Sequence, residues 1–203
     1  MVSICCVWLI NKFNLFRIMN VTETSLPGLL IIEPRIFKDS RGYFFESFHQ
    51  KKYEEKGIDK PFVQDNESKS EKGVVRGLHY QLAPHGQAKL VRVIEGTVYD
   101  VAVDLRKGSP TFGEWFGLEL DAYSKKQLFI PRGFAHGFSV LSKTAIFSYK
   151  CDNVYNKESE RSIQFKDPKL GIDWKIKKEE QIVSEKDENA PLFDEAEMNF
   201  IFT

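Results

Sequence analysis

The stretch TVYDVAVDL, residues 97–105, decides the fold class because its side chains alternate with the periodicity of a β-strand. The predicted strand collects one set of residues on each face: Tyr99, Val101, Val103 and Leu105 on the first, and Asp100, Ala102 and Asp104 on the second. Strand-like segments continue from about Phe62 to Lys150, separated by turns at residues 95–96, 107–110 and 131–133. Many short strands with closely spaced turns predict an all-β domain, either a sandwich or a barrel.

The segments on either side of this block are shorter and more mixed. We predict a strand over residues 29–32, a turn over residues 39–42 and an aromatic strand over residues 43–47. The charged residues 48–57 predict a short helix that a glycine ends. Residues 175–188 carry four Lys and five acidic residues, and we interpret most of this run as a solvated face.

Length and composition narrow the class of protein. The chain has 203 residues, of which 42% are hydrophobic, and this favours one large domain over a disordered tail protein. Lys and Arg together number 29, as do Asp and Glu, so the chain lacks the positive field of a nucleic-acid or acidic-membrane binder. Three cysteines cannot form a secreted disulfide framework, which favours a reducing compartment such as the cytoplasm. We assign no role to any of the three: Cys5, Cys6 and Cys151.

The first 18 residues differ from the rest of the chain. Their apolar run Ile4–Ile10 is too short to span a bilayer, and the flanking residues of a signal peptide are missing. Met19 then begins a stretch that reads like an ordinary protein start. We therefore interpret residues 1–18 as an upstream extension and residues 19–203 as a single domain; a functional extension is the alternative.

The segment VVRGLHYQ, residues 74–81, combines a strand pattern with two basic residues. Strict alternation would put Arg76 and His79 on opposite faces of a strand, but Gly77 permits a bulge, and bulges re-aim side chains beside active sites. Spacing alone favours a structural His79 over a catalytic one.

Lys89 shares a predicted strand face with Val91 and Val93, so its ammonium points toward apolar neighbours. Because desolvating an ammonium is costly, an inward-facing Lys must be paired or functional. The alternative is an edge strand with this face in water. Tyr149 lies in a further strand-like segment, where its hydroxyl could donate a proton, although a strand tyrosine more often serves packing alone.

The segment PRGFAHGF, residues 131–138, predicts a tight turn that presents the imidazole of His136. It resembles the Pro-x-Gly-x-x-His turn of cupin proteins, where the histidine is often a metal ligand. The partner motif of that family, His-x-His followed by Glu, is missing here. The four histidines do not support a three-His site, and we expect no bound metal: His49, His79, His85 and His136.

Seven ordered segments together resemble the dTDP-4-dehydrorhamnose 3,5-epimerase family of nucleotide-sugar enzymes. They lie between about Val21 and Leu192: FKDSRGYFFESF (37–48), FVQDNESKS (62–70), VVRGLHYQ (74–81), KLVRVIEGTVYDVAVDLR (89–106), SPTFGEW (109–115), QLFIPRGFAHGFSVLS (127–142) and VSEKDENAPL (183–192). The resemblance implies an all-β fold, a double-stranded β-helix or jelly-roll β-sandwich of cupin type with a few short helices.

The resemblance also implies a reaction. A dTDP-4-dehydro-6-deoxy-D-glucose would be epimerised at C3 and C5 to dTDP-4-dehydro-L-rhamnose, in dTDP-L-rhamnose biosynthesis. Both carbons flank the C4 ketone, so the enzyme removes a proton, holds the enolate and returns a proton to the opposite face. No redox cofactor or metal is implied. The family forms homodimers through N-terminal strands, and we expect the strand near residues 29–32 to be the exchanged edge.

The family pattern assigns catalytic roles to four residues of this chain. By resemblance, His79 is the general base and Asp187 orients its ring. Tyr149 corresponds to the proton donor on the opposite face, and Lys89 to the residue that stabilises the developing oxyanion. Asp100 lies in a family motif, and we expect it to be a second carboxylate near His79.

Further positions correspond to residues that hold the nucleotide or the sugar: Arg41, Glu46, Gln64, Asn66, Arg76, His136, Tyr155, Glu160 and Lys186. Arg and Lys would bind the diphosphate, and Tyr155 would stack on the thymine ring. Residues 150–154, between Tyr149 and Tyr155, are more polar than the family pattern. Two alternatives remain at this point, a single-carbon epimerase of another dTDP-4-keto sugar and a sugar-binding jelly-roll module without catalysis.

Overall fold

The computed structural model describes residues 19–202, in which strands dominate the regular structure. The predicted extension, residues 1–18, lies outside the described residues. The strands are β1 (Met19–Glu23), β2 (Leu30–Pro34), β3 (Phe37–Asp39), β4 (Gly42–Phe44), β5 (Gln64–Glu71), β6 (Val75–Gln81), β7 (Lys89–Glu95), β8 (Thr97–Asp104), β9 (Trp115–Asp121), β10 (Gln127–Ile130), β11 (Phe134–Val140), β12 (Thr144–Cys151) and β13 (Glu160–Ser162). The helices are α2 (Gln50–Glu54), η1 (Lys157–Ser159), η2 (Lys178–Glu180) and α3 (Glu185–Glu188).

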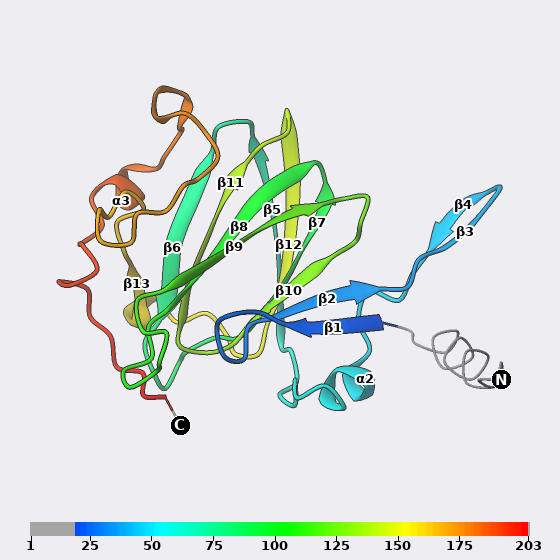
Figure 1. The fold of residues 1–203 in the computed structure, drawn as a ribbon, viewed down its shortest axis with the longest axis horizontal. Coiled ribbons are helices and arrows are strands. Elements are labelled where there is room, and N and C mark those ends of the chain that lie inside the picture. The colour runs from blue at the N-terminus through cyan, green and yellow to red at the C-terminus, as the bar shows by residue number, and fades with distance from the viewer. Residues whose placement is uncertain (1–18, 203) are drawn as a thin grey trace, which may run out of the picture.

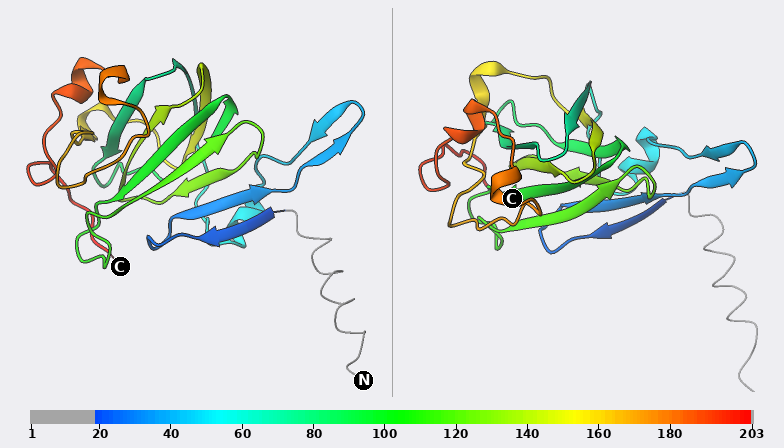
Figure 2. Two further views of the ribbon diagram at one scale, coloured as in Figure 1. Left: turned by 45° about the horizontal axis from the view of Figure 1, so that its top comes forward. Right: turned by 90° about the horizontal axis from the view of Figure 1, so that it is seen from above.

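Two antiparallel sheets pack face to face (Figures 1 and 2). One sheet has six strands in the order β1-β2-β10-β7-β12-β5, and the other has five in the order β13-β6-β11-β8-β9. Strands that are distant in the sequence become neighbours, as when β7 lies between β10 and β12. The predicted all-β sandwich of jelly-roll type is confirmed.

The main hydrophobic core fills the space between the two sheets. The six-stranded sheet contributes Val91, Val93, Leu128, Ile130 and Phe147, and the five-stranded sheet contributes Val98, Ala102, Leu120, Phe138 and Val140. All of these side chains are buried, and each large one stabilises the fold by about 1.5–3 kcal/mol through burial.

Strand β8 is covered on both faces. Its Ala102 face points into the sandwich, whereas Val101 and Val103 pack on the outer side against Phe165 and Trp174 of the C-terminal segment. That segment runs over the five-stranded sheet in Figure 1, beside β6. The predicted alternation of residues 97–105 is therefore correct, and it separates two cores rather than a core from solvent.

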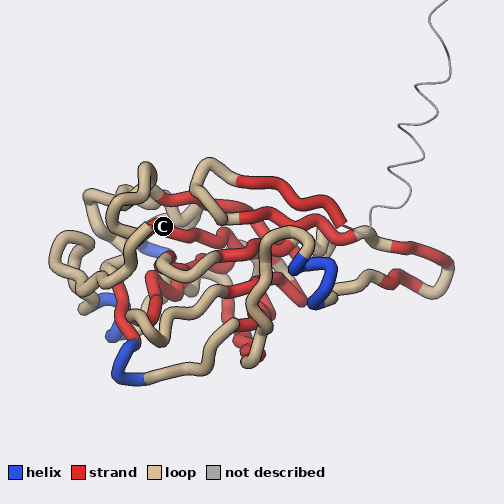
Figure 3. Tube along the Cα trace, turned by 90° about the horizontal axis from the view of Figure 1, so that it is seen from below, coloured by secondary structure: helices blue, strands red, loops and turns tan. Residues whose placement is uncertain are grey.

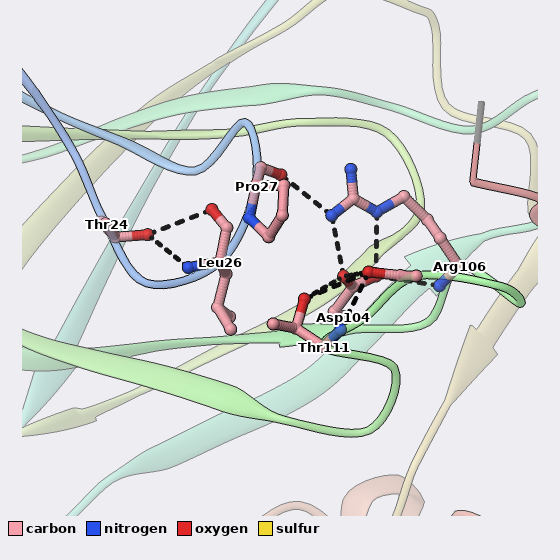
Figure 4. A network of polar contacts seen from close by, with 7 residues as sticks. Thr24, Leu26, Pro27, Asp104, Arg106 and Thr111 are labelled. Carbon is pink, nitrogen blue, oxygen red and sulfur yellow. Dashed lines mark hydrogen bonds and ion pairs between the residues drawn. The ribbon is translucent and has the colours of Figure 1, made fainter.

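A buried polar network ties the turn before β2 to the end of β8 (Figure 4). The guanidinium of Arg106 donates to both carboxylate oxygens of Asp104, at 2.9 and 2.7 Å, and to the carbonyl of Pro27 at 2.9 Å. The Thr111 hydroxyl donates to Asp104 Oδ2 at 2.8 Å. Because the Asp104 carboxylate is fully buried, each of these donors compensates for hydration that the group has lost.

The β3–β4 hairpin projects away from the sandwich (Figures 1 and 2). The predicted turn at residues 39–42 is confirmed, but β4 ends at Phe44, so the predicted strand to residue 47 is too long. Three aromatic side chains of the hairpin are exposed: Phe37, Tyr43 and Phe44.

Helix α2 is shorter than the predicted range of residues 48–57 and lies on the outer side of the six-stranded sheet, where Tyr53 packs near Ile32 and Leu90. Figure 3 shows it as a single short helical turn outside the strands. The chain leaves it through Gly57 at a φ of +84°, so the predicted glycine stop is confirmed.

The free edges of the six-stranded sheet are β1 and β5. Strand β2 is hydrogen-bonded to β1 on one side and to β10 on the other. Within one protomer β2 is therefore an internal strand, and the exchange of the strand near residues 29–32 between subunits stays a prediction. Residues 175–188 are mostly exposed, as predicted, with Asp187 as the buried exception.

Candidate active site

A cleft of about 430 Å³ opens between the two sheets. Both sheets and the loop after β12 supply its walls: Gln64, Asn66, His79, Tyr80, Gln81, Gln87, Lys89, Tyr149, Tyr155 and Glu160. A smaller cavity of about 130 Å³ shares His79, Lys89 and Tyr149 with it and adds Arg76 and His136. The fold therefore brings together most of the residues that the sequence predicts, from strands far apart in the chain.

A bulge in β6 directs His79 into this cleft. His79 pairs with His136 of β11 and Arg76 pairs with Phe138, so β6 holds one more residue than β11 between these pairs. The bulge puts Arg76 and His79 on the same cavity wall, as the glycine between them permits. At the bulge a Cβ on Gly77 would lie 2.6 Å from the Cα of Gly137, and Gly77 has a φ of +141°, so glycine is required there.

The imidazole of His79 is paired with a buried carboxylate. His79 Nε2 lies 2.6 Å from Asp187 Oδ1, and Asp187 is positioned by the single turn of α3, whose N-cap Ser184 accepts the Asp187 amide. Burial raises the pKa of Asp187, but the hydrogen bond and charge of His79 outweigh it, so the pKa lies below its ordinary value. Since an ionised carboxylate only accepts hydrogen bonds, Nε2 carries the proton and Nδ1 keeps the lone pair of a base.

Lys89 begins β7, which is an internal strand with neighbours on both sides. The side chains of Val91 and Val93 on the same face are buried in the core, so the alternative of an edge strand in water is wrong. Burial lowers the pKa of the Lys89 ammonium, and nearby negative groups such as Asp100 only partly oppose this. Among residues 19–202 no carboxylate forms an ion pair with Lys89, which leaves its ammonium directed at the cleft.

Tyr149 lies on the six-stranded sheet, across the cleft from His79 on the five-stranded sheet. Its ring packs 6.1 Å from that of Phe147, and the Lys89 ammonium lies 5.7 Å from its centroid. Burial raises the pKa of Tyr149, so its phenol stays protonated at neutral pH and can act as a donor.

His136 forms a second buried pair, with Asp100. Its Nε2 lies 2.9 Å from Asp100 Oδ2, and burial lowers the pKa of the imidazole although the carboxylate opposes this. Asp100 Oδ1 has no hydrogen-bond partner among residues 19–202. The prediction of Asp100 as a second carboxylate near His79 stays a prediction; its hydrogen-bond partner is His136, which is the cross-strand neighbour of His79. One prediction needs correction: His136 lies inside β11, two residues after the strand begins, rather than on the tight turn.

At the outer end of the cleft, several polar side chains are joined by hydrogen bonds. Lys186 Nζ lies 2.7 Å from Glu160 Oε2, which also accepts the Tyr155 hydroxyl at 3.2 Å. Gln64 donates to Asn66 at 3.1 Å and accepts the backbone amide of Tyr155 at 2.8 Å. The half-exposed ring of Tyr155 therefore forms a flat surface at the cleft wall, and hydrogen bonds fix both its hydroxyl and its backbone amide.

Two predicted binding residues lie away from both cavities and from the side chains that line them. Arg41 lies at the turn of the β3–β4 hairpin, where its side chain is 88% exposed and pairs with Asp39 at 2.6 Å. Glu46 follows the hairpin and pairs with Lys52 of α2 at 2.7 Å. Within one protomer, both are separate from His79 and its neighbours.

Sequence reasoning missed Gln81 and Gln87, which line the cleft. A signal was available for Gln81, because it lies two residues after His79 and so on the same strand face. Gln87 lies in the loop before β7, where no periodicity applies.

Among the residues that the structure describes, no three His, Cys, Asp or Glu side chains form a group that could hold a metal ion. No helix within 19–202 is long and apolar enough to cross a membrane. Cys151 is a buried free thiol, and burial raises its pKa to about 11.

Comparison with known proteins identifies the family. The model of the dTDP-4-dehydrorhamnose 3,5-epimerase family matches residues 23–195. The dTDP-4-dehydrorhamnose 3,5-epimerase of Shigella flexneri is 54% identical over 180 residues, which cover 88% of this chain and 98% of the relative.

Solved structures agree with this match. The crystal structure of dTDP-4-dehydrorhamnose 3,5-epimerase from Elizabethkingia anophelis has a TM-score of 0.85 at 58% identity, covering 88% of this chain and 98% of that one. The dTDP-6-deoxy-D-glucose-3,5-epimerase from Legionella pneumophila in complex with dTDP-4-keto-L-rhamnose has a TM-score of 0.84 at 53% identity, covering 87% and 94%. The chain therefore belongs to the dTDP-4-dehydrorhamnose 3,5-epimerase family.

Proposed function

We propose that this protein epimerises dTDP-4-dehydro-6-deoxy-D-glucose at C3 and C5, giving dTDP-4-dehydro-L-rhamnose for dTDP-L-rhamnose biosynthesis. The observation that carries the proposal is the His79–Asp187 pair at 2.6 Å, with Tyr149 on the opposite wall of the same cleft. Further support comes from the family membership and from the likeness to an epimerase solved with dTDP-4-keto-L-rhamnose.

The proposed chemistry is proton transfer alone. His79 Nδ1 takes the proton from C3 or C5, and the C–H electron pair forms the enolate of the C4 ketone. The Lys89 ammonium stabilises the negative oxygen. Tyr149 gives its phenolic proton to the opposite face of the same carbon, which restores the ketone with inverted configuration. Solvent then returns a proton to Tyr149 and removes one from His79, so the substrate is neither oxidised nor reduced.

We assign substrate binding to the polar residues around this centre. Arg76 and Lys186 would bind the diphosphate through charge-assisted hydrogen bonds. Tyr155 would stack on thymine, with Gln64 and Asn66 beside it. His136, held by Asp100, would contact the sugar from the deeper cavity, which the lining of that cavity supports.

The proposed functional unit is a homodimer in which the β3–β4 hairpin of one protomer reaches its partner. Support comes from the exposed aromatic side chains of the hairpin and from Arg41, a family substrate-binding position that lies outside its own protomer's cleft. The unpaired edge of β1 offers a second surface for pairing. Sedimentation at micromolar concentration should give a dimer, and a stable monomer would contradict this assembly.

We assign the activity to residues 19–203 as one domain, acting in a reducing compartment such as the cytoplasm. The free thiol of Cys151 agrees with such a compartment. The catalytic residues named above all lie within this domain.

Incubation with the 4-keto substrate in D₂O tests the activity. Deuterium should enter both C3 and C5, and NMR should detect the L-rhamno product. Exchange at one carbon only would favour a single-carbon epimerase, and binding without exchange would favour a sugar-binding module. A parallel reaction with the uridine nucleotide measures how strongly the base is recognised.

A further inference from the structure

Two loops stand side by side at the outer end of the cleft. Residues 82–88, between β6 and β7, carry Gln87, and residues 152–156, after β12, carry Tyr155. Neither loop has regular secondary structure; a backbone bond from the Asp152 amide to the Ala88 carbonyl, at 3.1 Å, joins them at one end, and side-chain hydrogen bonds hold the part that carries Tyr155.

Gln81 joins these two loops. Its side chain is buried, with 4% of the residue exposed, and both ends of its amide are used. Oε1 accepts the backbone amide of Asn156 at 2.6 Å, and Nε2 donates to the carbonyl of His85 at 2.7 Å. A third contact, from Nε2 to the carbonyl of Val154, is longer at 3.4 Å. One buried side chain therefore spans the gap between both loops.

The contact with Asn156 acts directly on the placement of Tyr155. Two consecutive backbone amides are held by glutamines from two strands, that of Tyr155 by Gln64 and that of Asn156 by Gln81. The Asn156 side chain in turn accepts the amide of Ser159 at 3.0 Å and caps η1. That turn leads into Glu160, which accepts the Tyr155 hydroxyl.

Residues that follow Tyr149 form further hydrogen bonds between the two loops. The Asp152 carboxylate accepts the amide of Ala88 at 2.7 Å, and the carbonyl of Asn153 accepts the side-chain amide of Gln87 at 2.8 Å. Of the polar side chains in residues 150–154, that of Asp152 thus joins the two loops, whereas Lys150 pairs with Asp65 of β5.

We propose that Gln81 is a positioning residue that holds Tyr155 in place for the nucleotide base of the substrate. The inference rests on the proposed function, because it takes Tyr155 as the surface for the base. Gln81 acts through the backbone of the 152–156 loop, while the His79–Asp187 pair and Lys89 stay where they are.

Gln81→Met tests this, because methionine has a similar size but forms neither hydrogen bond. Calorimetry with thymidine diphosphate should show a roughly tenfold loss of affinity, and kinetics should show a similar rise in KM with kcat within about twofold. Affinity for inorganic pyrophosphate should stay within about twofold, since Tyr155 is not expected to touch it. The control Gln181→Met removes a similar amide-to-carbonyl bond, to Ile176, outside the cleft and should change neither.

A double-mutant cycle separates positioning from direct contact. In a Tyr155→Ala background, Gln81→Met should add less than about twofold, because the group it positions is gone. A further tenfold loss there would overturn the inference, as would an unchanged affinity in the single variant. Failure of the wild-type protein to bind thymidine diphosphate would instead refute the proposed function. If Gln81→Met does not fold, Gln81→Asn replaces it, because the asparagine amide is too short to reach both loops. The same affinities for thymidine diphosphate, alone and in the Tyr155→Ala background, then decide.

Discussion

Replacing Asp187 by Asn tests the catalytic assignment most directly. The carboxylate lies 2.6 Å from His79 Nε2, is buried, and does not line the cleft itself. The amide has the same shape but no charge, so it leaves the packing around α3 in place. What it removes is the negative partner of the imidazolium that forms when His79 takes a proton.

The expected loss follows from the type of bond. A hydrogen bond to a charged group contributes about 1.5–3 kcal/mol, and each 1.4 kcal/mol is a factor of about ten in rate. The imidazolium exists only after proton abstraction, so its stabilisation belongs to the transition state rather than to substrate binding. We therefore expect kcat to fall by about 10- to 100-fold with KM nearly unchanged.

The assay is deuterium incorporation at C3 and C5, followed by NMR at saturating and limiting substrate. Asp173→Asn serves as the control, because that carboxylate also forms a 2.6 Å contact, with Lys175, but is exposed on the surface. It should leave kcat unchanged. A kcat for Asp187→Asn within about threefold of wild type, or a loss confined to KM, would refute the role of Asp187 as the partner of a catalytic base.

Three further predictions concern the opposite wall, the oxyanion and the buried network of Figure 4. In Tyr149→Phe, His79 can still remove a proton and return deuterium to the same face of the carbon, so some exchange should remain while inversion falls by at least about 100-fold. Inversion at the wild-type rate would contradict the role of Tyr149 as the donor. Lys89→Met should lower kcat by about 10²- to 10³-fold, and a change in KM alone would count against enolate stabilisation. Asp104→Asn should destabilise the fold by about 3–5 kcal/mol at pH 7, measured by urea unfolding. Burial raises the pKa of Asp104, but its donors outweigh this and hold the pKa below 3.8, so the ionised group stabilises the fold above that pH. Wild type should therefore lose stability as the pH falls below about 4, with a shallower loss in Asp104→Asn; parallel acid profiles would contradict this account.

Local patterns in the sequence were sufficient for an all-β domain, sandwich or barrel, and the family resemblance was needed to choose the jelly-roll sandwich. Alternation over residues 97–105 identifies a strand whatever covers its two faces, and a glycine that follows Arg76 permits a bulge. The pattern could not tell that the C-terminal segment covers the Val101 face, because that contact joins residues more than sixty positions apart, such as Val101 and Phe165. Strand existence is local information, whereas burial of a face depends on the whole topology.

Pairing of charged groups was harder to predict for the same reason. The sequence could not identify the partner of Asp100, which is His136, because the register of β8 and β11 sets Asp100 opposite Phe138 and two residues from His136. The partner of His79 lies 108 residues further along the chain and came only from the family resemblance. Side-chain pairing across strands depends on register, and register depends on bulges and loop lengths that composition does not encode.

The sandwich itself explains why this arrangement suits inversion at carbon. Inversion needs a base and an acid on opposite faces of one planar enolate, and two facing sheets supply two facing walls. His79 comes from the five-stranded sheet and Tyr149 from the six-stranded sheet, while Lys89 lies beside Tyr149. The close contact of Gly77 with Gly137 is what directs His79 across the gap, because a side chain at Gly77 would push β6 away from β11. Gly77→Ala should therefore displace the imidazole of His79 and reduce kcat even where the protein still folds. The hydrogen bonds around Tyr155 should stay intact.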